Sequence, residues 1–186
     1  MSDPFLRPFI FGVVACAVAA AIVVLAAVEL GLVPANADAK PSKLEEWAAK
    51  TSLRATINRE TDRKAPNPLR PSDESLDAGI DLYATNCGIC HGTSDGKKSL
   101  IAQGFSIEAP QLAKDGVERD PPTRVYWEVE HGIRFTAMPA FSTRLTEKQM
   151  WQVALFLQKM DALPAEPDTR WHALPTSAKL VQVPAK

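Results

Sequence analysis

A Cys-x-x-Cys-His motif, formed by Cys87, Cys90 and His91, most strongly constrains what this chain can fold into. Two thiols three residues apart on one helical turn can each add across a vinyl group of the same porphyrin, and the histidine that follows is then held beneath the iron. We expect these residues to bind one haem c covalently, with His91 as an iron ligand. Such a large apolar cofactor would supply the core that a short helical domain cannot build by itself.

Three other uses of the motif fit the sequence less well. A thioredoxin-like redox pair follows a strand in a βαβ setting, whereas a helical pattern leads into Cys87. A structural zinc ion takes four ligands, and only His131 and His172 remain as further nitrogen ligands. A structural disulfide between Cys87 and Cys90 would leave His91 without a role.

A haem iron has a sixth coordination position, and the sequence offers five candidates for it: Met138, Met150, Met160, His131 and His172. Met138 lies in a loop between two predicted helices, where Pro139 fixes the adjacent backbone. Met150 and Met160 lie on the last predicted helix and are expected to be core or surface residues. We predict Met138 as the sixth ligand, with a histidine or an open position as the alternatives.

Helical periodicity predicts an all-α domain over residues 73–163. Fifteen prolines and nine glycines favour short helices joined by long loops over a sheet. The last helix should open at Thr146, because Gln149 completes a capping box with it. The expected elements are a first helix over 73–87, a loop over 92–118, a helix over 121–131 capped by Asp120, and a last helix over 146–162.

Residues 73–163 resemble a class I c-type cytochrome, through the attachment motif, the Met138-Pro139 loop and the two flanking helices. The resemblance implies a fold of short helices around a covalently bound haem. It also implies that the carbonyl of Pro110 accepts the proton of the proximal imidazole, which fixes the ring and tunes the metal.

The same resemblance implies that the first and last helices cross, with a glycine of one against an aromatic residue of the other. The matching positions are Gly79 and Tyr83 on the first helix and Phe156 on the last, with Trp151 nearby.

The N-terminal region contains an almost wholly apolar run over residues 9–33. About 20 such residues span a hydrocarbon core of about 30 Å as a helix. We expect residues 1–37 to be a single-pass anchor in a bacterial inner membrane, and Arg7 favours a cytoplasmic N-terminus with the haem domain in the periplasm. A signal peptide cleaved after residues 35–37 and a lipoprotein signal at Cys16 are the alternatives, although the run is longer than either pattern expects.

The remaining segments are polar or rich in proline. Residues 38–72 should form a linker with a short helix over 43–53, followed by a semi-stiff spacer over 59–71. The tail over 164–186 is expected to be disordered or loosely packed. The 21 basic and 22 acidic residues nearly cancel, which argues against a nucleic-acid partner.

An iron with two protein ligands has no open position for a substrate, so we expect an electron carrier and not an enzyme. It would act as a membrane-tethered carrier or as the cytochrome subunit of a respiratory or dehydrogenase complex, with redox proteins in or near the membrane as partners. One alternative is a haem enzyme or gas sensor with a displaceable sixth ligand. Another is a membrane-anchored assembly factor, which would bind no haem.

Overall fold

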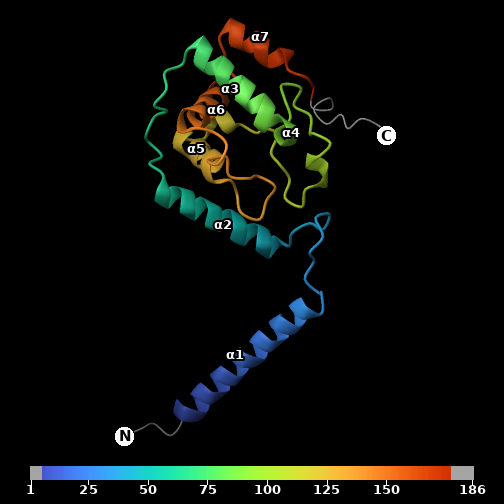
Figure 1. Cartoon of the computed structure of the whole chain (residues 1–186). Helices are drawn as coiled ribbons and strands as arrows, with labels where there is room; N and C mark the ends of the chain where they lie inside the picture. Colours follow the sequence, from blue (N-terminus) through green and yellow to red (C-terminus); the bar gives the residue numbers. More distant parts are fainter. Residues whose placement is uncertain (1–5, 177–186) are drawn as a thin grey trace, which may run out of the picture. The chain divides into compact units, whose positions relative to one another are not determined.

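A computed structural model describes residues 6–176 of the chain, and all regular structure in that range is helical (Figure 1). The chain divides into two compact units, Met1–Ala39 and Lys40–Lys186. The described residues therefore confirm the all-α class that the periodicity predicts.

The first unit contains helix α1, Leu6–Glu29. Its 24 residues make a helix about 36 Å long at 1.5 Å per residue. Residues Arg7–Glu29 are long and apolar enough to cross a membrane, and among the described residues no other helix meets that test. The helix ends before Gly31, whose φ of 67° lies in the left-handed region that favours glycine.

Helix α2, Lys43–Glu60, opens the second unit. Ser42 and Glu45 form a capping box at its start: the Ser42 amide donates to the Glu45 carboxylate at 2.6 Å, and the Glu45 amide donates to the Ser42 hydroxyl at 3.3 Å. The helix continues about two turns beyond the predicted end at residue 53. This extension buries Ile57, which is only 3% exposed.

The segment after α2 corrects the expectation of a spacer over 59–71. The Thr123 hydroxyl donates to the Asp62 carbonyl at 2.9 Å, and the Asn67 side chain donates to the Trp151 carbonyl at 3.1 Å. Prolines restrict the backbone of this segment, but its polar groups bond to the helical domain instead of holding it at a distance.

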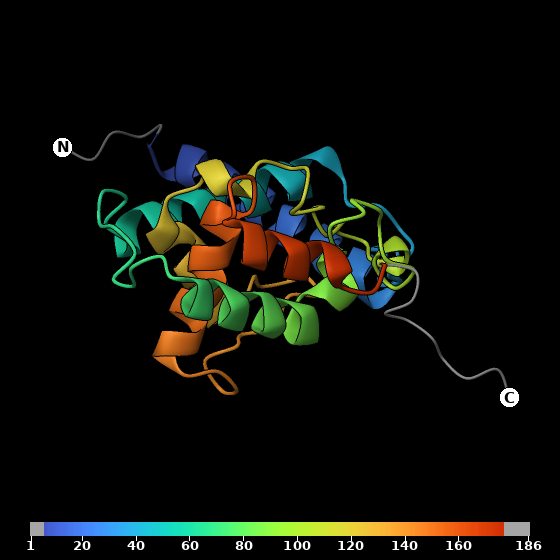
Figure 2. The same ribbon diagram turned by 90° about the horizontal axis from the view of Figure 1, so that it is seen from above.

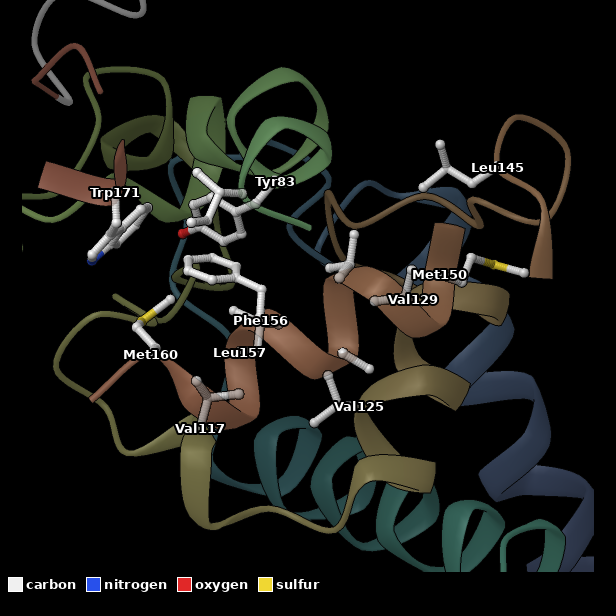
Figure 3. Close-up of a cluster of buried hydrophobic side chains, with 13 residues drawn as sticks. Tyr83, Val117, Val125, Val129, Leu145, Met150, Phe156, Leu157, Met160 and Trp171 are labelled. Atoms are coloured by element: carbon white, nitrogen blue, oxygen red, sulfur yellow. The ribbon is translucent and has the colours of Figure 1, made fainter. Parts of the chain in front are cut away.

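Helices α3, Asp73–Asn86, and α6, Glu147–Lys159, cross at the centre of the unit. The Thr146–Gln149 capping box starts α6 as predicted. Gly79 on α3 lies against α6, where an added Cβ would stand 2.8 Å from the Cβ of Phe156. Tyr83 and Phe156 meet edge to face with ring centroids 5.4 Å apart (Figure 3). The predicted glycine–aromatic crossing is therefore present.

Helix α5, Pro122–His131, packs on α6. Tyr126 of α5 stacks on Trp151 of α6 with centroids 4.2 Å apart, so Trp151 faces α5 and not the α3 crossing. The predicted N-cap is wrong: Pro121 occupies that position, and the Asp120 carboxylate instead accepts from Arg124 at 3.2 Å. Pro122 is the first helical residue, and its fixed φ favours that position. The N-cap therefore falls on Pro121, one residue after the predicted Asp120.

Helix α7, Ala165–Ala173, corrects the expectation of a loose tail. It lies beside α3 (Figure 2). Trp171 is 3% exposed and packs edge to face on Tyr83 and Phe156, with centroids 5.4 and 5.0 Å apart. Pro167 does not break the helix because it falls in the first turn, where backbone N–H groups have no helical partner. Residues 177–186 of the predicted tail lie outside the described residues.

Candidate haem site

The attachment motif follows α3 without a break. Cys87 ends α3 and precedes the single-turn helix α4, Gly88–His91. The amides of Cys90 and His91 both donate to the Cys87 carbonyl, at 3.0 and 2.9 Å. This turn brings both thiols and the imidazole together as the motif requires.

The two cysteines form no disulfide. Burial raises the pKa of Cys87 to about 12, with a smaller contribution from Cys90, and burial also raises the pKa of Cys90. Both are therefore neutral thiols near pH 7. Within residues 6–176 no cluster of three or more His, Cys, Asp or Glu could hold a metal ion, which counts against the zinc alternative.

His91 donates from Nδ1 to the carbonyl oxygen of Pro110 at 2.9 Å. A carbonyl only accepts, so the proton of a neutral imidazole must lie on Nδ1, and Nε2 keeps its lone pair for a metal. Burial lowers the pKa of His91, and the bond to Pro110 opposes that effect. The ring is thus fixed in the tautomer that an iron ligand needs.

Gln111, next to Pro110, is a buried residue that the sequence did not single out. Gln111 is only 7% exposed, yet neither the nitrogen nor the oxygen of its side-chain amide has a hydrogen-bond partner in the protein. Buried polar atoms without partners are rare in folded proteins, and a bound water, ion or other group is one explanation for them. The thiols, the oriented imidazole and this orphaned amide fit a haem with polar substituents.

Met138 lies in the loop between α5 and α6 and is half-buried. Its backbone is fixed on both sides: its amide donates to the Thr136 hydroxyl at 3.1 Å, and its carbonyl accepts from the Ile133 amide at 3.1 Å. Gly132 begins this loop with a φ of 66°, and an added Cβ there would stand 2.7 Å from the Met138 carbonyl. The loop therefore requires glycine at this position.

The other candidate ligands make the following contacts. Met150 and Met160 are 3% and 6% exposed and belong to the hydrophobic core (Figure 3). His172 donates from Nδ1 to the Asp168 carbonyl, 3.0 Å away, and its side chain is exposed on α7. His131 lies at the end of α5 beside Glu130, with 3.3 Å between Nε2 and the carboxylate.

Comparison with known proteins places this domain in a family. The family model described as "Cytochrome C oxidase, cbb3-type, subunit III" matches residues 74–157. Cytochrome c6 of Limnospira maxima is 32% identical over 82 residues, which cover 43% of this chain and 86% of the relative. Cytochrome c6 of Parathermosynechococcus lividus is 28% identical over 79 residues, covering 42% of this chain and 83% of the relative.

A longer protein also matches. The "Cbb3-type cytochrome c oxidase subunit FixP" of Sinorhizobium medicae is 28% identical over 102 residues, which cover 50% of this chain. The match spans only 32% of that relative's length. No solved structure matches the chain. The chain therefore belongs to the c-type cytochromes, which transfer electrons through a covalently bound haem c.

Proposed function

We propose that this chain binds a single haem c, ligated by His91 and Met138, and transfers electrons as a membrane-tethered carrier or as the cytochrome subunit of a respiratory or dehydrogenase complex. The observation that carries the proposal is the 2.9 Å hydrogen bond between His91 Nδ1 and the Pro110 carbonyl. That bond orients the imidazole before any metal binds.

Each residue of the site has one task in this proposal. Cys87 and Cys90 would hold the cofactor by thioether bonds, His91 and Met138 would ligate its iron, and Pro110 fixes the His91 ring. The haem supplies a one-electron couple between ferrous and ferric iron. Ligation by histidine and methionine raises the reduction potential and leaves no position for a substrate.

The cysteine count supports one haem. The chain has three cysteines, and the third, Cys16, lies in α1, away from any histidine in the sequence. One attachment motif is therefore available within the 186 residues.

Helix α1 supports membrane attachment by its length and apolar composition. We place the chain in a bacterial inner membrane with the haem domain in the periplasm, since Arg7 favours a cytoplasmic N-terminus. A tether confines the domain to a thin layer and raises the effective concentration of membrane partners. The similarity to FixP, named as an oxidase subunit, supports the complex-subunit form of the proposal.

Carbon monoxide distinguishes this proposal from a gas sensor or haem enzyme. We expect the reduced full-length protein, purified in detergent, to keep its absorption spectrum when carbon monoxide is added, because both axial positions are filled. Rapid formation of a carbon monoxide complex would instead indicate an open or displaceable sixth position.

The membrane part of the proposal has its own test. After a carbonate wash the protein should remain in the membrane pellet, and its N-terminal sequence should begin near residue 1. A mature chain that begins at Asp38 and is washed off would indicate a cleaved signal peptide and a soluble carrier.

A further inference from the structure

An open cavity of about 270 Å³ lies where the end of α2 meets α5 and α6, and the haem site does not use it. Its volume is below the range of about 300–1,000 Å³ usual for drug-sized ligands, so it suits a small one. His131 also lines it, with Nε2 3.3 Å from the Glu130 carboxylate, whereas no lysine or arginine is among the lining residues. Its lining residues include three acidic and three large aromatic ones: Glu60, Asp62, Glu130, Tyr126, Trp127 and Trp151.

Two hydrogen bonds join the end of α2 and the segment after it to α5. The indole nitrogen of Trp127 donates to Glu60 Oε2 at 3.0 Å, and the Thr123 hydroxyl donates to the Asp62 carbonyl at 2.9 Å. Hydrogen bonds from Arg59 and Trp127 hold the pKa of Glu60 below its ordinary value, so this carboxylate stays ionised near pH 7. The Glu60 carboxylate is therefore held in position at the cavity by Trp127 at one oxygen and by Arg59, 2.7 Å from the other.

Two further lining residues, Tyr126 and Trp151, are aromatic. Tyr126 and Trp151 are stacked with an interplanar angle of 19°, and the Tyr126 hydroxyl donates to Glu130 Oε1 at 3.2 Å. Burial, together with Glu130, raises the pKa of Tyr126 to about 12, so its hydroxyl remains a donor. The rings are thus held in place by each other and by a second carboxylate.

We infer that this cavity binds a small organic ammonium ion. Aromatic faces attract cations through the ring quadrupole, and carboxylates supply the opposite charge at short range. An anion is disfavoured because three of the lining residues are acidic, whereas His131 is the one basic residue among them. A metal ion is disfavoured because the described residues contain no cluster of ligands that could hold one. The ammonium group could belong to a free quaternary amine or to a lysine side chain of a partner protein, since the binding chemistry is the same.

The experiment uses the full-length haem protein in an uncharged maltoside detergent, because choline-containing detergents would compete. Tetramethylammonium and butylammonium, the latter a mimic of the lysine side chain, are titrated separately at constant ionic strength set with sodium chloride. Binding is measured by saturation-transfer NMR on the ligand methyl signals and by calorimetry.

The variants are Trp127→Leu and Glu130→Gln, with Trp47→Leu as the control. Trp47 is 63% exposed on α2 and does not line the cavity. Loss of the Trp127 ring should weaken binding about two- to thirtyfold. Loss of the Glu130 charge should weaken it about two- to fivefold while keeping an acceptor for Tyr126. The control should bind like the wild type.

The outcomes are separable. Binding of either ammonium ion that both cavity variants weaken supports the inference, and the stronger ligand identifies the source: tetramethylammonium a free quaternary amine, butylammonium a lysine. The absence of binding, equal competition by sodium, or equal weakening in the Trp47 control would overturn it. The haem absorption spectrum of each variant confirms that it has folded around its cofactor.

Discussion

Replacing Gly79 with alanine, at the crossing of α3 and α6, has two opposing effects on the free energy of unfolding. Alanine favours an interior helical position over glycine by about 1 kcal/mol, so helix propensity alone predicts a more stable protein. However, the added methyl would stand 2.8 Å from the Cβ of Phe156 and even closer to the carbonyl oxygen of Gln152. Neither atom can rotate away, because the Gln152 oxygen belongs to the backbone and the Phe156 Cβ is bonded directly to it.

Overpacking of this kind costs about 1–3 kcal/mol, and the rigid neighbours favour the upper part of that range. After the gain in propensity we expect Gly79→Ala to lower the free energy of unfolding by about 1–2 kcal/mol. For a domain of this size that corresponds to a fall in melting temperature of about 2–8 °C.

The assay is thermal unfolding of the full-length haem protein, followed by far-ultraviolet circular dichroism. Gly104→Ala is the matched control, because no atom lies within 4 Å of the Cβ it adds and the backbone is not in the left-handed region. We expect the control to be neutral or more stable. A Gly79→Ala protein that melts at or above the wild-type temperature would refute the close helix crossing.

Three further predictions concern the site and the last helix. The double variant Cys87→Ala/Cys90→Ala should show no haem stain after denaturing electrophoresis; retained covalent haem would contradict the attachment. Met138→Ala should keep its haem but bind carbon monoxide when reduced, with a lower potential, because the loop is held by backbone bonds; an unchanged potential would exclude Met138 as ligand. Trp171→Ala should cost about 3–5 kcal/mol of unfolding free energy in chemical denaturation, whereas the exposed neighbour His172→Ala should cost little.

Features that depend on residues close together in the sequence could be predicted. The attachment motif, the Thr146–Gln149 capping box and the end of α5 at Gly132 each depend on residues within one or two helical turns. The Gly79 crossing is long-range, but a glycine inside an otherwise apolar helical pattern indicates close packing by itself. The Pro110 bond to His91 came from the family resemblance, since nothing local to residue 110 indicates it.

The extent of α2 and the existence of α7 could not be predicted in the same way. Ile57 is a single apolar residue in a polar segment, so its burial becomes apparent only when α2 docks on the domain. Helix α7 has nine residues, and isolated helices of that length are marginal in water. Its stability comes from Trp171 entering the aromatic cluster, a contact with residues about 15 and 88 positions earlier that no local pattern contains.

That cluster connects the unpredicted helix to the predicted site. Trp171 and Phe156 pack on the ring of Tyr83, and the Tyr83 hydroxyl donates at 2.9 Å to the carbonyl of Gly92, the residue after His91. Burial raises the pKa of Tyr83 well above its ordinary value, so the hydroxyl remains a donor at any physiological pH. The turn that carries His91 is therefore fixed from two directions, by Pro110 on the imidazole and by Tyr83 on the backbone. Because Trp171 of α7 packs on the Tyr83 ring, this C-terminal helix helps to position His91 through Tyr83.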